Sequence, residues 1–294
     1  MLQSRRDMLK MAAFSAAAGP FAGALARGAD APKELIGAAP AAAPGPDRWK
    51  GLRAGVASYS FRKLPLDQTI AAIKRVDLHY VSIKDLHLSL KSTAEERKAV
   101  AQQFRDAGIT PISCGTISIK DEATARQAFE YARDIGVSAI VCDPQPQTLP
   151  LLDKLVKEFD IKIAIHNHGP EAKHFKSPYD AWEAVQAFDP RVGLCIDVGH
   201  TARAGTDPAE AIRKCRTRMH DCHFKDIIKV DAKPAVAEVE CGRGILDIRG
   251  MLQALLEIKY AGHVGFEHEK TAENPLPGLA ESMGYTKGVL SSIA

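Results

Sequence analysis

The sequence predicts a single domain of the α/β class, a (β/α)8 or TIM barrel that spans residues 51–294. Short apolar runs alternate with amphipathic runs from about residue 52 onward, as strands and helices do around a parallel sheet. Eight apolar runs can be distinguished, the number of strands that closes such a barrel. The rival architecture, an open doubly wound sheet, more often has a glycine-rich phosphate loop after its first strand. Here the first strand ends in Ala57-Ser-Tyr-Ser-Phe-Arg62, and we therefore prefer the closed barrel.

The expected strands and helices alternate along the chain. The strands are Leu52–Phe61, His79–His87, Ile109–Ile117, Val137–Cys142, Ile161–His168, Val192–Asp197, Met219–Asp226 and His263–Glu269. The helices are Leu66–Val76, Thr93–Ala107, Glu122–Ile135, Thr148–Phe159, Pro178–Phe188, Pro208–Cys215 and Ile245–Ile258. Pro178 and Pro208 fit the first turn of a helix, while Gly108, Gly136 and Gly262 fit positions where a helix has ended and a strand follows.

The first fifty residues do not follow the barrel pattern and divide into two segments. Residues 1–30 resemble a twin-arginine export signal, in which Ser4-Arg-Arg-Asp-Met-Leu-Lys10 precedes an alanine-rich apolar run from Met11 to Ala26. That run is shorter than the roughly 20 residues that span a bilayer, which argues against a stable membrane anchor. Residues 31–50 are rich in alanine and proline and indicate a linker. We therefore expect an exported, periplasmic or otherwise extracytoplasmic protein.

The charge of the chain argues against a nucleic-acid partner. The formal net charge is +3, and removing the four basic and two acidic residues of the first thirty leaves 35 and 34. Nucleic-acid-binding domains usually present a basic face. The six cysteines lie mostly in apolar strand-like runs and form no Cys-x-x-Cys pair, so we expect buried thiols rather than disulfides. The sequence does not determine the number of subunits.

Metal-binding residue types stand at the ends of four consecutive expected strands, the fifth to the eighth. Alternate residues of a barrel strand point inward, and barrel active sites lie at the carboxyl ends of the strands. In each strand the apolar residues occupy one alternate set and the polar end residue occupies the other. Two imidazoles with two carboxylates suit a divalent transition metal, and the alternative is a set of unrelated polar strand ends. The four expected ligands are His166, Asp197, His223 and Glu267.

Five motifs in the barrel region carry a resemblance to a known family. They are Ile165-His-Asn-His-Gly169, Cys195-Ile-Asp-Val-Gly-His200, His223-Phe-Lys-Asp226, Gly242-Arg-Gly-Ile-Leu-Asp247 and Gly262-His-Val-Gly-Phe-Glu267. From about Leu52 to its end, the chain resembles the xylose isomerase-like barrel superfamily, the sugar phosphate isomerases and epimerases. The resemblance implies one divalent ion, often manganese, with Asp197, His223 and Glu267 among its ligands. It also implies that His200, in the spacing Asp-x-x-His, contacts the substrate.

The fifth strand departs from the pattern of the resembled family. Many relatives have Glu-Asn-His where this chain has His166-Asn-His168, and in the epimerases the strand-five and strand-eight glutamates bind the metal and move the proton. A histidine removes one negative charge from the ligand set and favours metals that accept nitrogen. Manganese is the first expectation, with zinc, cobalt or iron as alternatives. Because a metal-bound imidazole cannot act as a base, we expect Glu267, His168 or Glu269 to move the proton.

Five residues are candidate substrate contacts. His200 is one of them, by the resemblance. Lys225 shares the inward face of the seventh strand, and Arg243 follows it in a glycine-flanked motif; each can hold a substrate oxygen or lie as a solvated surface charge. Tyr59 near the end of the first strand can stack on a sugar ring or pack in the core. His87 at the end of the second strand is a weaker pocket candidate.

These residues favour proton abstraction beside a carbonyl group. The first hypothesis is a metal-dependent isomerase or epimerase of a free sugar or keto-sugar, because an exported enzyme meets few phosphorylated metabolites. The second is a lyase or dehydratase that acts on 3-oxo-glycosides or keto-sugars. A third is a sugar-binding barrel without turnover. A barrel endonuclease is the least favoured, since it needs more metal ligands and a basic surface.

Overall fold

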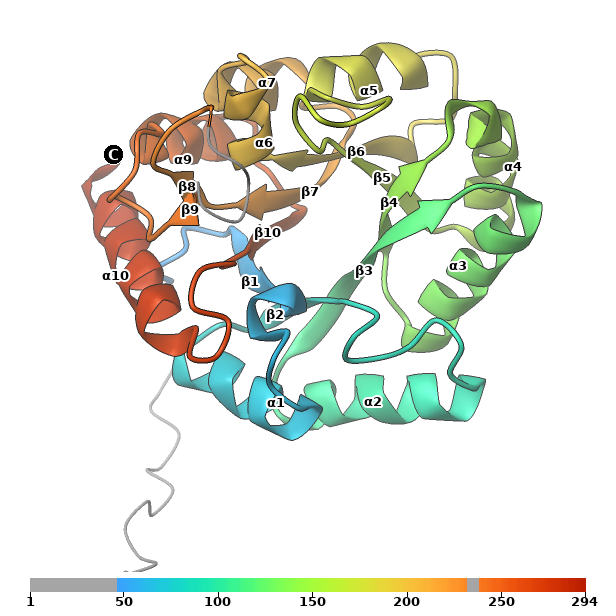
Figure 1. The fold of residues 1–294 in the computed structure, drawn as a ribbon, viewed down its shortest axis with the longest axis horizontal. Helices are drawn as coiled ribbons and strands as arrows, with labels where there is room; N and C mark the ends of the chain where they lie inside the picture. Colours follow the sequence, from blue (N-terminus) through green and yellow to red (C-terminus); the bar gives the residue numbers. More distant parts are fainter. Residues whose placement is uncertain (1–46, 232–237) are drawn as a thin grey trace, which may run out of the picture. The chain divides into compact units, whose positions relative to one another are not determined.

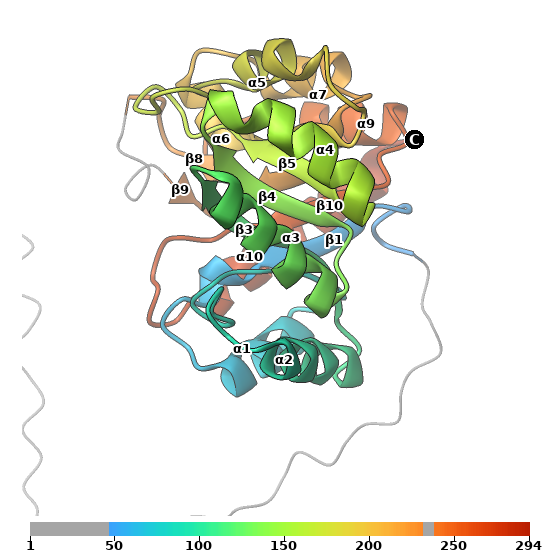
Figure 2. The same cartoon turned by 90° about the vertical axis from the view of Figure 1, so that its right-hand side faces the viewer.

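The computed structural model describes residues 47–231 and 238–294, which form the closed barrel that the sequence predicts (Figure 1). Eight parallel strands pair in the ring order β1-β10-β7-β6-β5-β4-β3-β2, so that β10 closes the barrel against β1. A short antiparallel ribbon, β8 (Asp226–Ile227) with β9 (Glu238–Val239), directly follows β7 at the C-terminal end of the barrel (Figure 2). The barrel strands are β1 (Arg53–Ala57), β2 (Tyr80–Ile83), β3 (Thr110–Ile119), β4 (Ala139–Pro144), β5 (Lys162–His166), β6 (Val192–Asp197), β7 (Met219–Phe224) and β10 (His263–Phe266).

Helices surround the barrel on its outside (Figure 1). Three of them begin at capping boxes, in which Thr93, Asp121 and Ser177 accept a backbone N–H three residues ahead. Each such cap stabilises its helix by about 1 kcal/mol. The helices are α1 (Leu66–Arg75), α2 (Ala94–Asp106), α3 (Glu122–Ile135), α4 (Leu149–Phe159), α5 (Pro178–Val185), α6 (Val198–Arg203), α7 (Pro208–Lys214), α9 (Ile248–Glu257) and α10 (Leu276–Ser292), with 3-10 turns η1 (Ser58–Phe61) and η2 (Pro146–Thr148).

The barrel strands present two faces to different surroundings. Ile163 and Ile165 of β5 belong to the main core, which lies between the barrel and its helices. Ala164 belongs instead to a separate buried cluster with Cys195 of β6, inside the barrel. His166 stands two residues beyond Ala164 and therefore shares its inward face. The alternation predicted from the sequence is confirmed in these strands.

Five strands end earlier than the sequence analysis predicts: β5, β7 and β10 by two or three residues, and β1 and β2 by four. β1 ends at Ala57 and the chain continues as η1, so that Tyr59 lies on a 3-10 turn rather than on a strand. β2 ends at Ile83, and His87 consequently lies in the loop that follows. Both predictions extended an apolar run past the point where its backbone stops pairing.

Serine side chains of η1 explain why pairing stops there. The N–H of Lys84 donates to the Oγ of Ser58 at 2.9 Å, and the N–H of His268 donates to the Oγ of Ser60, also at 2.9 Å. Hydroxyl groups thus provide the partners that a longer β1 would have supplied to β2 and β10. This substitution of side chain for backbone leaves no periodic signal in the sequence.

The predicted signal segment, residues 1–30, lies outside the described residues, as does most of the predicted linker, residues 31–50. Of the few linker residues described, Trp49 packs its ring 5.7 Å from that of Phe266. No helix in residues 47–231 and 238–294 is long and apolar enough to cross a membrane. All six cysteines are free and buried, as predicted.

Candidate metal centre and active-site cavity

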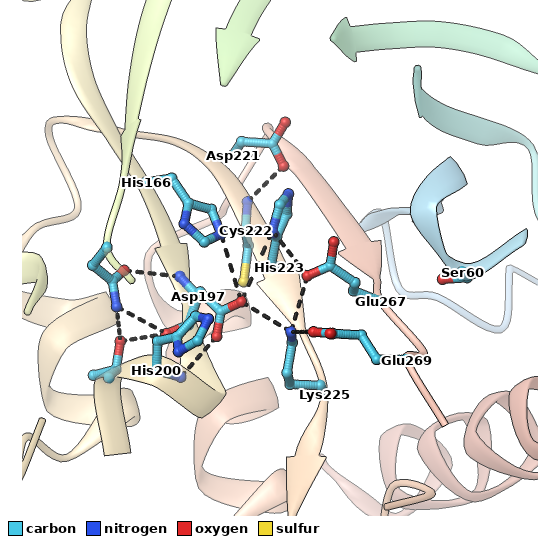
Figure 3. A network of polar contacts seen from close by, with 12 residues as sticks. Ser60, His166, Asp197, His200, Asp221, Cys222, His223, Lys225, Glu267 and Glu269 are labelled. Carbon is cyan, nitrogen blue, oxygen red and sulfur yellow. Dashed lines mark hydrogen bonds and ion pairs between the residues drawn. The ribbon is translucent and has the colours of Figure 1, made fainter. Parts of the chain in front are cut away.

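The four expected metal ligands lie together at the C-terminal mouth of the barrel (Figure 3). His166 ends β5, Asp197 ends β6, His223 lies in β7 and Glu267 directly follows β10. One ligand atom of each residue lies within 4.8 Å of those of the others. All four residues are buried. The structure therefore brings together the whole set that the sequence singles out.

The facing atoms of this cluster fit a divalent cation. The Nε2 of His166 lies 2.8 Å from the Nδ1 of His223 and 3.6 Å from the Oδ2 of Asp197. The Nδ1 of His223 lies 3.3 Å from the Oε2 of Glu267. The Oδ2 of Asp197 is fully buried and accepts no hydrogen bond among the described residues, although the Nζ of Lys225 lies 3.2 Å from it. Buried carboxylate oxygens usually accept a hydrogen bond, and a metal ion would be a suitable second partner for this oxygen beside the lysine.

Hydrogen bonds fix Asp197 so that one carboxylate oxygen faces the cluster. Asn167 accepts the N–H of Asp197 at 3.0 Å and donates to its carbonyl group at 3.2 Å, which joins the ends of β5 and β6. The N–H of His200 donates to the Oδ1 of Asp197 at 2.8 Å, as in a helix N-cap. Oδ2 instead faces the other candidate ligands and the Nζ of Lys225. The motif Asp197-Val-Gly-His200 thus both begins α6 and orients the carboxylate of Asp197.

Lys225 brings a positive charge to the edge of the cluster. Its Nζ lies 2.9 Å from the Oε2 of Glu267, 3.0 Å from the Oε1 of Glu269 and 3.2 Å from the Oδ2 of Asp197. A Cβ added at Gly199 would lie 2.9 Å from the Cδ of Lys225. The glycine therefore provides the space through which the lysine side chain reaches these carboxylates.

The electrostatic balance sets the protonation states of the candidate ligands. Burial alone would raise the pKa of Asp197, but Lys225 and nearby histidines hold this pKa well below its usual value. Burial opposes Lys225 and His223 in the same way at Glu267, whose pKa is also held well below normal. Burial lowers the pKa of His166 well below its usual value. Ionised carboxylates and a neutral imidazole are the forms that metal coordination requires.

A cavity of about 550 Å³ opens at this cluster, with His166 and Glu267 in its wall. This volume lies within the range of roughly 300–1,000 Å³ typical of small-molecule sites. Four other residues that the sequence singles out also line the cavity. They are Tyr59, His168, His200 and Glu269.

A guanidinium group orients His200. The Nη1 of Arg203 lies 3.2 Å from the Nδ1 of His200. Because a guanidinium can only donate, Nδ1 must accept and the ring hydrogen must be on Nε2. Burial lowers the pKa of His200, in keeping with a neutral ring. Arg203 also pairs with Glu171, a cavity-lining residue of the β5–α5 connection.

His87 lies outside the lining of this cavity. Its Nδ1 lies 3.0 Å from the Oγ of Ser58, and its Nε2 lies 2.9 Å from the Oγ1 of Thr69 and 3.2 Å from the carbonyl oxygen of Leu64. These contacts join the loop after β2 to η1 and α1. The structure therefore places His87 in a loop-bracing network rather than at the predicted substrate contact.

Arg243 also lies outside the cavity lining, because its motif wraps around a carboxylate. Asp226 accepts the N–H groups of Gly242 and Gly244 at 2.9 Å each. Gly242 has a φ of +91°, and a Cβ at Gly244 would lie 2.1 Å from the Oδ1 of Asp226. Both glycines are thus required for the loop itself. The Arg243 side chain is exposed and pairs with Glu281 of α10 at 2.8 Å, which corresponds to the surface alternative.

Four cavity-lining residues were not predicted from the sequence. Lys84 is buried and lies 3.7 Å from the Oε1 of Glu267. It stands two residues after Ser82, so the alternation rule that identified the other strand ends also applies to it. Regular alternation is lost at the remaining three, since two lie in loops and one lies in β3 where its register with β4 shifts. They are Asp85, Thr116 and Glu171.

Comparison with known proteins assigns the fold to a family. A model of the xylose isomerase-like TIM barrel matches residues 70–289. The chain belongs to this family. A curated relative, the inosose dehydratase of Geobacillus kaustophilus (strain HTA426), is 25% identical over 206 residues, which are 56% of this chain and 65% of that enzyme. The chain spans only 52% and 65% of the lengths of two curated relatives that it matches.

Solved structures of the family superpose over most of the barrel. The IolI protein with a bound zinc atom gives a TM-score of 0.68 at 18% identity, covering 82% of this chain and 99% of that one. The 3-keto-D-glucoside 4-epimerase YcjR of E. coli, in its apo form, gives 0.65 at 16% identity, covering 81% and 99%. At these identities the likeness establishes the fold.

Proposed function

We propose that this protein is a divalent-metal-dependent isomerase or epimerase of a free sugar or keto-sugar. One observation carries the proposal: four ligand atoms within 4.8 Å of one another adjoin a cavity that is also lined by two acid–base side chains outside the ligand set. Those side chains are His168 and Glu269. Family relatives that act on sugars and keto-sugars support the substrate class. The preference for a free sugar depends on the export that we propose from residues 1–30.

The residues of the cavity divide the chemistry among them. A divalent ion at the cluster would polarise a substrate carbonyl and so acidify the neighbouring C–H bond. His168 follows β5 and Glu269 follows β10, two strands that are not neighbours in the barrel. One of these side chains takes the proton from the carbon and the other returns a proton to it. Lys225, 3.0 Å from the Oε1 of Glu269, orients this carboxylate.

The remaining contacts hold the sugar. His200 donates from its Nε2 to a substrate hydroxyl group, since Arg203 occupies the other ring nitrogen. Tyr59 provides an aromatic wall on which the sugar ring packs. For the ion, we propose manganese first, with zinc, cobalt or iron as alternatives. Two imidazole ligands favour these metals over magnesium, and the zinc-bound relative supports a site of this kind.

A lyase or dehydratase is the second candidate function. Elimination needs a base for the proton and a different acid for the leaving group, and His168 and Glu269 are chemically unlike. His166 also removes the pair of equivalent glutamates expected of an epimerase. The similarity to an inosose dehydratase supports this alternative.

Incubation of the metal-loaded full-length protein in D₂O tests the two candidates. Free ketohexoses, inososes and 3-oxo-glucosides serve as substrates, and mass spectrometry with NMR follows the products. We expect deuterium on the carbon beside the carbonyl group together with an isomer or epimer. Release of an aglycone or loss of water would favour the lyase. Absence of deuterium exchange with every substrate would contradict both candidates and favour a sugar-binding protein without turnover.

A further inference from the structure

A second cavity lies at the opposite, N-terminal mouth of the barrel. It has a volume of about 190 Å³ and is lined by the first residues of several strands and by the helix-to-strand turns beside them. Arg53 begins β1 and Lys162 begins β5, while Arg216 and Lys259 lie in the turns before β7 and β10. None of the residues proposed for the metal site or its substrate lines this cavity.

Two of these cations belong to the inward face of the barrel. Lys162 shares the alternate set of Ala164 and His166, which point inside. Arg53 shares the set of Gly55, where an added Cβ would lie 2.5 Å from the Nε2 of His263, a buried side chain. The inward face at this mouth therefore carries two cations, in a position where barrels usually pack branched aliphatic side chains.

The charge of this mouth is not balanced by the residues around it. None of the four cations pairs with a carboxylate within the described parts of the chain. The one acidic residue in the lining is Asp221, whose Oδ1 already lies 3.1 Å from the Nδ1 of His263. Isolated surface cations are ordinarily solvated, but four around one small cavity raise the local concentration of anions.

The floor of the cavity contains buried polar atoms that lack partners. The Oγ of Ser113, the Nε2 of His263 and the Oδ2 of Asp221 have no hydrogen-bond partner among the described residues. All three residues line the cavity and are at most 1% exposed. Buried polar groups are satisfied in the great majority of cases, which points to a polar occupant rather than to a dry void.

We propose that the N-terminal mouth is a binding site for a small dianion of the phosphate type. Arg53, Lys162, Arg216 and Lys259 surround its oxygens, and the buried hydroxyl of Ser113 contacts it from the floor. Guanidinium groups match the geometry of a tetrahedral oxyanion. The volume accommodates a phosphate group with a short carbon chain. This site is independent of the function proposed for the other mouth.

Inorganic phosphate is the probe that tests the site. Isothermal titration at low ionic strength compares the metal-loaded wild-type protein with an Arg53→Gln/Lys162→Gln variant. The matched control is Arg75→Gln/Lys98→Gln, which removes the same charge from exposed positions on α1 and α2. We expect saturable binding that weakens about tenfold or more in the first variant and is unchanged in the control. Metal content should be the same in all three proteins.

Several results would overturn the proposal. Wild-type protein without saturable phosphate binding would do so, as would equal weakening in the control variant, which would indicate a general charge effect. Binding that survives the Arg53→Gln/Lys162→Gln substitution would place phosphate at the metal instead. Succinate, a dicarboxylate, should bind more weakly, and equal or tighter binding would exclude the phosphate type. If the double variant fails to fold, Lys259→Gln in an exposed turn provides the same comparison.

Discussion

The two mouths of the barrel are built on the same strands but carry opposite charge. The cavity at the C-terminal mouth is lined by four acidic residues and one lysine, whereas the cavity at the N-terminal mouth is lined by one acidic residue and four lysines or arginines. β5 illustrates the contrast, since it begins with Lys162 and ends with His166. Four residues along a strand span about 13 Å. A single inward face thus presents a candidate metal ligand at one end and a cation at the other, so the position along the strand distinguishes the two mouths.

Removal of a ligand at the acidic mouth should have the largest effect. His166→Ala deletes one nitrogen donor, and we expect metal affinity to fall by about 100-fold or more, because the loss of even an outer-shell partner costs 10–100-fold. Activity should fall with it. Elemental analysis after gel filtration measures the bound metal. Arg53→Gln at the basic mouth is the control and should retain full metal content. An unchanged metal content in His166→Ala would show that this histidine is not a ligand.

Lys225→Met tests whether this lysine offsets the repulsion among the carboxylates at the C-terminal mouth. The substitution removes the ammonium group beside the buried Glu267 and the half-buried Glu269, and among the described residues it leaves only the ammonium group of Lys84, 3.7 Å from Glu267. Breaking a buried ion pair costs about 3–5 kcal/mol, so urea unfolding of the metal-free variant should show a loss of that order. Added Zn²⁺ or Mn²⁺ should restore part of the lost stability. An identical loss with and without metal would contradict a shared role of lysine and ion in balancing these carboxylates.

The basic mouth should produce a pH effect of its own through His220. Burial lowers the pKa of this ring to about 4, and its Nε2 lies 2.9 Å from the carbonyl oxygen of Pro190. Above pH 6.5 both folded and unfolded chains hold a neutral ring. Between pH 6.5 and about 4 the unfolded chain takes up the proton and the folded protein does not. The free energy of unfolding therefore decreases as the pH is lowered through this range.

His220→Gln keeps a donor for the Pro190 carbonyl group and removes that proton uptake. We expect the decline of stability between pH 6.5 and 4 to become shallower in thermal unfolding scans. His79→Gln, at an exposed histidine, is the control and should leave the slope as in the wild type. If the stability of wild type and of His220→Gln depends on pH in the same way, His220 is not the source of this pH effect.

The smallest effect is expected at Arg243, which belongs to neither mouth. Its side chain pairs with Glu281 at the surface, and exposed pairs contribute little. Arg243→Gln should therefore change kcat/KM by less than about twofold, and Glu281→Gln should behave alike. A tenfold loss confined to Arg243→Gln would restore it as a substrate contact.

The fold and the ligand cluster could be predicted because both follow from periodicity. Alternate positions in β5 and β6 separate Ile165 from His166 and Ile196 from Asp197, and parallel strands bring such ends to one mouth. The same rule would have found Lys84, had the end of β2 been placed correctly. The ends of β1 and β2 were misplaced where a hydroxyl group replaced a backbone partner, as at Ser58.

Loop residues could not be predicted for a different physical reason. The direction of a loop side chain depends on contacts between segments far apart in the sequence. Arg243 faces outward because the N–H groups of Gly242 and Gly244 on either side of it donate to Asp226. Glu171 lines the cavity beside its partner Arg203. Neither arrangement has a spacing that a single sequence reveals. The motif Gly242-Arg-Gly244 suggested a substrate loop. In the structure its glycines are needed for the backbone around Asp226, and its arginine lies at the surface.

The two serine contacts of η1 have a consequence for rebuilding this barrel. Ser58 binds the backbone after β2 and Ser60 binds the backbone after β10, so one turn of four residues fastens the rim on both sides of the first strand. β1 and β10 are far apart in the sequence but neighbours in the barrel, and this turn links their ends. A split or circularly permuted version should therefore keep Ala57 to Phe61 intact and place its new ends in another connection.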